Sequence, residues 1–331
     1  MSVDTGSLID TALEVSVVGS FSRVGFQVRR WLFGWAAPAD GSLAGRTALV
    51  TGPTSGLGRE TVDGLAALGA RVVLVGRSAT RLAAVRDTLV AAHGEDRFPI
   101  VVADMGSLVS VRAAVAKVLA SEERLDILVD NAGAIYPERL IGPDGIEATL
   151  AIMAVAPFVL ISGLLPLLER SGDARVISVT SGGLYTQALD LDDLQWATET
   201  FSGPRAYARV KRVQTTLVRE WARRLRTAGR TSVTINAMHP GWADTPGLAE
   251  QLPGFYDTMR PLLRSAAEGV DTIIWLATEP GAGAGGGRLY LDRRPRPFDR
   301  VPSTRVSAAD RRRLWDIVVG LTGDPDPIPG A

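Results

Sequence analysis

Residues 47–58 read TALVTGPTSGLG, a short apolar run that passes directly into a glycine-rich turn. The run 47–50 predicts a buried strand, and the residues from Gly56 to Gly69 predict a helix. Glycines let such a turn approach a pyrophosphate, and a helix N-terminus offers free N–H groups and a positive dipole end. A P-loop is disfavoured because Arg59-Glu60 follows where Lys-Ser/Thr would be needed. The alternative is that the glycines only permit a tight turn.

The order of strand and then helix repeats along the chain. Further strands are predicted at 71–75, 99–103, 126–129, 174–180, 231–238 and 287–291. The alternation implies a parallel sheet with helices on both faces. We therefore predict an α/β fold with a Rossmann-type doubly wound parallel sheet, as a single domain over residues 46–291. Residues 1–45 would form an N-terminal amphipathic helical extension, and residues 292–331 a C-terminal tail with one helix near 307–320.

Composition excludes several classes of protein. The 331 residues have a formal net charge of zero with dispersed basic residues, so no electrostatic footprint for nucleic acid is present. The absence of cysteine rules out disulfides, thiolate metal sites and a cysteine nucleophile, and it permits a cytoplasmic location. His93 and His239 lie far apart in the sequence, so we expect no metal site.

The N-terminal extension carries apolar residues at steps of three and four and ends in an aromatic, basic segment. This spacing predicts one amphipathic helix. Residues 15–36 can then either lie on a membrane surface as a peripheral contact, or pack on the domain or a partner subunit. The residues in the repeat are Val17, Phe21, Val24, Val28, Trp31 and Trp35.

Residues 148–168 carry no charge over a span long enough to cross a bilayer. Pro157 and Pro166 interrupt the segment, no basic residues flank it, and it lies within the strand-helix alternation. We therefore predict a helix buried against the sheet and a second subunit, in a homodimer or homotetramer.

The residues that follow two of the predicted strands indicate a dinucleotide-binding site. The strand at 71–75 ends in Gly76-Arg77-Ser78, with no acidic residue to bind a ribose 2′-hydroxyl. Arg77 is placed to meet a 2′-phosphate, which favours NADP over NAD. Asp130-Asn131-Ala132-Gly133 ends the strand at 126–129, at the carboxyl edge where ligands bind in such sheets.

Tyr207 and Lys211 are four residues apart and share one face of a predicted helix that reaches about Thr227. Lys211 is one of only two lysines among 36 basic residues. An ammonium beside a phenol lowers its pKa, which suits proton transfer in alcohol/carbonyl chemistry. Ser181, at the end of the strand 174–180, can point into the cleft or cap a turn. We interpret the arginines of this helix as a solvated face, and residues 248–262 as a lid for a lipophilic substrate or a packed connection.

Taken together, these motifs occur in the order seen in the short-chain dehydrogenase/reductase family, which the chain resembles over roughly residues 46–291. The motifs are Thr51-Gly-x-x-x-Gly56-x-Gly58, Asn131-Ala132-Gly133, Ser181, Tyr207-x-x-x-Lys211 and His239-Pro240-Gly241. The resemblance implies an oxidoreductase in which Tyr207 is the general acid/base. Lys211 would lower the pKa of Tyr207 and bind the nicotinamide ribose, and Ser181 would hold the substrate oxygen.

The resemblance also implies a set of cofactor contacts. Glycines of the turn would meet the pyrophosphate, Asp104 the adenine, Asn131-Ala132-Gly133 the adjoining ribose, and Pro240, Gly241 and Thr245 the nicotinamide. The expected cofactor-binding residues are Gly52, Thr54, Ser55, Gly56, Leu57, Gly58, Arg77, Asp104, Met105, Asn131, Ala132, Gly133, Tyr207, Lys211, Pro240, Gly241 and Thr245.

Two positions depart from the family pattern. Met153 stands where the family usually has a catalytic asparagine, and a thioether cannot hold a relay water as an amide can. Asp130 replaces the usual first asparagine of an Asn-Asn-Ala-Gly run. This departure looks milder than the one at Met153. We therefore expect an NADP-dependent oxidoreductase acting on a small lipophilic alcohol/carbonyl substrate, in the cytoplasm or associated with a membrane. The alternative is a cofactor-binding module with little or no catalysis.

Overall fold

Eight strands form one sheet in the order β3-β2-β1-β4-β5-β6-β7-β8 in the computed structural model, which describes residues 5–94 and 97–331. Strands β1 to β7 pair in parallel, and β8 runs antiparallel to β7. The predicted Rossmann-type sheet is therefore confirmed. The strands are β1 (Thr47–Thr51), β2 (Arg71–Gly76), β3 (Ile100–Val102), β4 (Ile127–Asp130), β5 (Ala174–Val179), β6 (Val233–Met238), β7 (Leu289–Leu291) and β8 (Arg294–Arg296).

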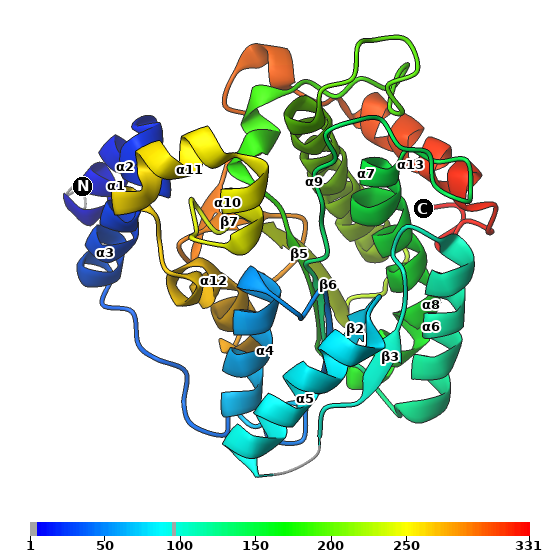
Figure 1. Cartoon of the computed structure of the whole chain (residues 1–331), viewed down its shortest axis with the longest axis horizontal. Coiled ribbons are helices and arrows are strands. Elements are labelled where there is room, and N and C mark those ends of the chain that lie inside the picture. Colours follow the sequence, from blue (N-terminus) through cyan, green and yellow to red (C-terminus); the bar gives the residue numbers. More distant parts are fainter. Residues whose placement is uncertain (1–4, 95–96) are drawn as a thin grey trace.

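Helices cover both faces of the sheet, as Figure 1 shows. One apolar core lies between the sheet and α4 (Gly56–Ala67), α5 (Ala79–His93) and α12 (Ala266–Thr278). A larger core lies on the opposite face, under α6 (Leu108–Ser121), α8 (Ala156–Ser171) and α9 (Gly203–Thr227). Burial on both faces explains why the central strands are continuous apolar runs.

The uncharged segment forms one continuous helix made of α7 (Ala148–Leu150), a π-helical turn η1 (Ala151–Val155) and α8. By length and composition the helix Ala148–Ser171 could cross a membrane, but 78% of its most apolar window is buried inside the protein. Phe158 packs against Trp221 of α9 and Trp315 of α13 (Ala308–Thr322), with ring centroids 5.1 and 4.8 Å away. The chain's own C-terminal helix therefore covers this segment, where the sequence suggested a second subunit.

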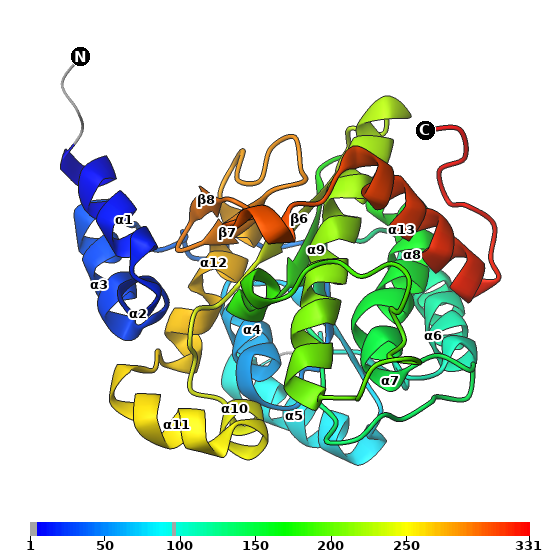
Figure 2. The same ribbon diagram turned by 90° about the horizontal axis from the view of Figure 1, so that it is seen from above.

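Helix α9 begins four residues before Tyr207 and ends at Thr227. Its arginines form a solvated face only in part: Arg205 and Arg226 are exposed, whereas three others are buried. Arg209, Arg212 and Arg224 are buried, and Figure 2 shows α13 of the C-terminal segment beside α9. Their ion-pair partners are Glu199 for Arg209, Asp299 for Arg212, and Glu220 and Asp326 for Arg224.

The N-terminal extension consists of three short helices, α1 (Thr5–Val15), α2 (Val17–Phe21) and α3 (Arg23–Leu32), where one helix was predicted. Ser16 caps α2, and Ser22 adopts an extended conformation between α2 and α3. The Ser16 side chain accepts from the Gly19 N–H, and this competition for a backbone hydrogen bond explains the break before α2. Because the helix is broken, Val17, Val24 and Trp31 of the predicted stripe are exposed.

The remaining elements surround the carboxyl edge of the sheet or the C-terminal segment. They are η2 (Gly182–Thr186), α10 (Pro246–Gln251), α11 (Pro253–Met259), η3 (Arg260–Leu262) and η4 (Pro302–Thr304).

Candidate active site

The glycine-rich turn after β1 is shaped by close backbone contacts. Gly52 has a φ of 68°, and a Cβ on Gly58 would lie 2.1 Å from the Gly52 carbonyl oxygen. The Asn131 amide donates to the carbonyl oxygens of Thr51 and Gly52 at 3.0 and 3.3 Å. Ser55 precedes α4 without a side-chain capping bond. The first N–H groups of α4 therefore face a cradle that a side chain would fill, and such a helix end attracts an anion.

Other predicted cofactor residues lie along the same carboxyl edge. Thr245 follows β6 and caps α10, and a Cβ on Gly56 would lie 3.4 Å from the Thr245 side chain. Arg77 and Asp104 are exposed just after β2 and β3. The structure therefore brings the glycine turn and Thr245 together and places Arg77 at the strand end where the sequence predicted it.

Of the other predicted cofactor residues, Thr54 and Leu57 flank the turn at the start of α4, and Pro240 and Gly241 follow β6. Met105 and Ala132 follow β3 and β4. Leu57 is the second residue of α4, and each of the others lies in a connection at the carboxyl edge.

Ser181 and Tyr207 meet beside β5. Ser181 caps η2 by accepting from the Gly183 N–H at 3.2 Å, so the capping interpretation holds. A Cβ on Gly183 would lie 3.4 Å from the Ala208 Cβ, so η2 rests directly on α9. The pKa of Tyr207 is raised by burial, while hydrogen bonding from the Ser181 hydroxyl to the phenol acts in the opposite direction. The two hydroxyls thus form one polar pair that could bind a single substrate oxygen.

Lys211 lies one turn beyond Tyr207, and its Nζ is 5.5 Å from the centre of the tyrosine ring. The ammonium donates to the Val179 carbonyl oxygen at 2.8 Å and to Gln214 Oε1 at 3.0 Å. Burial is the largest effect on Tyr207 and raises its pKa, so the net lowering expected from the sequence is not seen. The physical reason is the removal of the phenol from water, which disfavours its charged form.

The sequence interpretation missed a buried polar network below Lys211. Asp130 Oδ2 accepts from Gln214 Nε2 at 2.8 Å and from Ser178 Oγ at 3.0 Å. Burial raises the pKa of Asp130 to about 6, against the opposing charge of Lys211. Burial lowers the pKa of Lys211 to about 8, against the charge of Asp130. The available signal was the spacing of Gln214, three residues after Lys211 on the same helix face.

Met153 is fully buried in the π-helical turn η1. A Cβ on Gly133 would lie 3.1 Å from the Met153 sulfur, so the thioether packs directly behind the Asn131-Ala132-Gly133 turn. Turns of π-helix occur often at functional sites. At this position the chain supplies apolar packing and no proton carrier.

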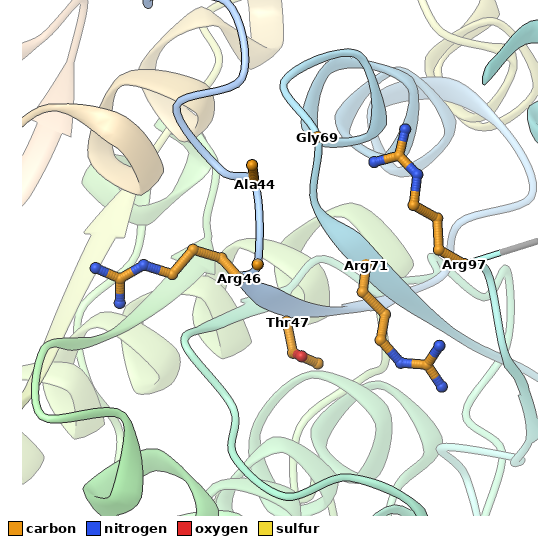
Figure 3. Close-up of a pocket in the computed structure, with 7 residues that line it drawn as sticks. Ala44, Arg46, Thr47, Gly69, Arg71 and Arg97 are labelled. Carbon is orange, nitrogen blue, oxygen red and sulfur yellow. The ribbon is translucent and has the colours of Figure 1, made fainter. Parts of the chain in front are cut away.

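A cavity of about 360 Å³ lies at the opposite, amino edge of β1 and β2. Arg46 and Arg71, which line it, pair with Asp126 and Glu122. The guanidinium groups of Arg46, Arg71 and Arg97 point away from one another in Figure 3. This cavity is separate from the site at the carboxyl edge, and its arginines do not converge on one ligand.

Comparison with known proteins fits this geometry. A sequence model described as short chain dehydrogenase matches residues 46–192. Human dehydrogenase/reductase SDR family member 12 is 36% identical over 281 residues, which cover 84% of this chain and 87% of the human protein. The chain belongs to the short-chain dehydrogenase/reductase family. It is therefore an NAD(P)-dependent oxidoreductase, and members of this family act on small-molecule substrates.

Two further members of the short-chain dehydrogenase/reductase family are informative. Human retinol dehydrogenase 13 is 31% identical over 237 residues, which cover 70% of this chain and 70% of that protein. The structure of a 3-oxoacyl (acyl-carrier-protein) reductase from Agrobacterium tumefaciens C58 with NADP bound is 27% identical, with a TM-score of 0.60. The match covers 75% of this chain and 92% of that chain. The glycine cradle and the uncapped start of α4 fit the pyrophosphate of such a cofactor.

Proposed function

We propose that this protein is an NADP-dependent oxidoreductase that transfers a hydride between the nicotinamide cofactor and a lipophilic alcohol/carbonyl substrate, with Tyr207 as general acid/base. The observation that carries the proposal is the contact of η2 with α9, which brings Ser181 at the carboxyl end of β5 beside Tyr207, with Lys211 Nζ 5.5 Å from the centre of the tyrosine ring. Two hydroxyls that share one position can polarise a carbonyl oxygen and deliver a proton to it.

In the direction of carbonyl reduction, each residue of the site has a separate role. A bound nicotinamide supplies the hydride. Ser181 donates a hydrogen bond to the substrate oxygen, and Tyr207 gives that oxygen its proton as negative charge develops. The raised pKa of Tyr207 keeps the phenol protonated near neutral pH, which suits this direction. The Lys211 ammonium, fixed by Val179 and Gln214, stabilises the phenolate that remains.

The preference for NADP rests on Arg77. Its exposed side chain follows β2, where a dinucleotide fold places the 2′ position of the adenosine ribose. A guanidinium there binds a 2′-phosphate, whereas an acidic residue would bind a 2′-hydroxyl. The NADP-bound reductase from Agrobacterium tumefaciens supports the same assignment by similarity.

The lipophilic character of the substrate rests on the segment after β6. Helices α10 and α11 and the turn η3 contribute no buried residues, so they lie on the surface of the domain after β6. Phe255 of α11 contacts Trp242 edge-on, with ring centroids 5.2 Å apart, which gives this segment an apolar inner side. The similarity to retinol dehydrogenase 13, whose name refers to a lipophilic alcohol, points the same way.

The proposal is tested by NADPH binding and turnover with the purified protein. NADPH binding is followed by nicotinamide fluorescence, and NADPH oxidation is followed with a panel of lipophilic ketones and aldehydes. We expect both binding and turnover. The absence of NADPH binding at millimolar concentration would overturn the proposal.

A second candidate function is a cofactor-binding module with little catalysis. The buried thioether of Met153 favours it, because no proton carrier occupies that position. NADPH binding without oxidation by any ketone or aldehyde would support this candidate.

We also infer that the N-terminal extension makes a peripheral membrane contact. Exposed large apolar side chains gather on α1 to α3, and Trp31 is 80% exposed. They are Leu8, Ile9, Val15, Val17, Val18, Val24 and Trp31. Co-sedimentation with anionic liposomes should fall when Val17, Val24 and Trp31 are replaced by serine. Unchanged co-sedimentation, or none for the unaltered protein, would remove this inference.

The homodimer or homotetramer stays a prediction, and its original reason is weaker because α13 covers the apolar helix. Light scattering coupled to size-exclusion chromatography decides it. A monomer at micromolar concentration would contradict the prediction.

A further inference from the structure

Phe21 lies in the N-terminal extension, yet its ring borders the catalytic serine. A Cβ on Gly182, the residue after Ser181, would lie 2.5 Å from Phe21 Cε2. On its other side the ring meets His239 edge-on, with centroids 4.7 Å apart. The Phe21 side chain therefore fills the space between the loop after β5 and the loop after β6, and only 4% of it is exposed.

The backbone of the extension is bonded to the same loop. The Phe21 carbonyl oxygen accepts from the Trp242 N–H at 2.8 Å and from Arg264 Nε at 3.0 Å. A Cβ on Gly241 would lie 2.6 Å from that oxygen, and Gly241 has a φ of 72°. Glycine is needed here both for its conformation and for the close approach of the two chains.

Buried ion pairs anchor the extension on the domain. Arg29 is fully buried and donates to Asp10 and Asp292, each at 2.7 Å. Arg264, also buried, binds both oxygens of Asp292 and the Ser20 carbonyl oxygen. Removing one partner of such a network leaves an uncompensated buried charge, which is strongly unfavourable. The position of Phe21 is therefore fixed as firmly as that of a core residue.

We propose that the N-terminal extension forms a wall of the substrate site and that Phe21 limits the size of the substituent that a substrate carries beside Ser181. The inference rests on the proposed function, since it requires a substrate oxygen bound at Ser181 and Tyr207. A ring packed against Gly182 leaves little room for a branched group on that side of the carbonyl carbon. Its apolar surface favours a small alkyl group there.

The test compares two hexyl ketones whose second substituent is methyl or tert-butyl. We expect Phe21→Ala to raise the ratio of kcat/KM for the tert-butyl ketone to that for the methyl ketone by about tenfold or more, because a removed side chain opens room for several carbons. Phe26→Ala is the matched control, since Phe26 is 3% exposed on the adjacent helix and contacts Trp35. It should leave the ratio within about twofold of the unaltered protein.

An unchanged ratio in Phe21→Ala would overturn the inference, provided that circular dichroism shows Phe21→Ala to be as folded as Phe26→Ala. Phe21→Leu, which keeps more of the apolar volume, supplies a second variant should the alanine variant unfold, and its ratio should be intermediate.

Binding of the same ketones to the complex of the protein with NADPH tests the role of Phe21 separately from the proposed oxidoreductase function. If the unaltered protein binds NADPH but reduces neither ketone nor any other member of the panel, the proposed function fails, and the dissociation constants then decide the role of Phe21. Tighter binding of the tert-butyl ketone to Phe21→Ala than to the unaltered protein supports the proposal that Phe21 limits the size of the substituent. Equal dissociation constants in both proteins contradict it.

Discussion

Lys211 and Asp130 are joined through one side-chain amide, that of Gln214, which accepts from Lys211 Nζ at 3.0 Å and donates to Asp130 Oδ2 at 2.8 Å. Asp130 stands at the end of β4, and Lys211 stands one turn after Tyr207 on α9. The charge on Asp130 thus acts on the ammonium that supports the proposed proton donor. Asp130, whose replacement of asparagine looked mild in the sequence, accepts the hydrogen bonds of Gln214 and Ser178 in this buried network.

Asp130→Asn should shift the pH dependence of turnover. The negative charge of Asp130 raises the pKa of Lys211, which burial lowers to about 8. Without that charge the pKa of Lys211 falls further, so the loss of its positive charge occurs at lower pH. The alkaline limb of the profile of kcat/KM against pH should therefore move to lower pH. An alkaline limb in the same place would show that Asp130 does not act on Lys211.

Arg77→Ala should weaken NADPH binding by roughly tenfold to a hundredfold, the value of a charge-assisted hydrogen bond. NADH binding should change little, because NADH has no 2′-phosphate. Arg86→Ala is the control, since Arg86 lies further along α5 and pairs with Asp87. Equal losses for NADPH and NADH in Arg77→Ala would contradict the assignment. Fluorescence titration of both cofactors against the unaltered protein and the two variants gives the six dissociation constants.

Met153→Asn should destabilise the protein by about 2–4 kcal/mol, because it replaces a fully buried thioether with an amide that the apolar surroundings cannot satisfy. Met153→Leu keeps the volume and should cost under about 1.5 kcal/mol. Urea unfolding measures both. A Met153→Asn variant as stable as the unaltered protein would show that polar partners or water already reach this position.

Trp315→Ala should lower the free energy of unfolding by about 3–5 kcal/mol, since the indole is fully buried between Phe158 and Trp221. Trp31→Ala is a control of the same residue type, and its 80% exposed side chain predicts a change within about 0.5 kcal/mol. Equal effects in urea unfolding would contradict the packing of α13 on the domain.

Local patterns were enough to predict the sheet and the positions of Ser181, Tyr207 and Lys211, because each lies in or directly after a regular element whose period is visible in the sequence. The burial of Arg212 was not predictable in this way. Its partner Asp299 lies 87 residues away, and only the folded chain brings the two together. The same holds for Phe21 beside Gly182, since no local pattern indicates that a broken N-terminal helix reaches the loop after β5.

Tyr207→Phe tests the proposed chemistry most directly. The variant keeps the ring and removes only the hydroxyl beside Ser181, so NADPH should still bind, because the glycine-rich turn and Arg77 are unaltered. NADPH oxidation with a ketone that the unaltered protein reduces should fall by about a hundredfold or more, the contribution of a positioned general acid. Turnover in Tyr207→Phe equal to that of the unaltered protein, at equal NADPH binding, would contradict the role of Tyr207 as the proton donor.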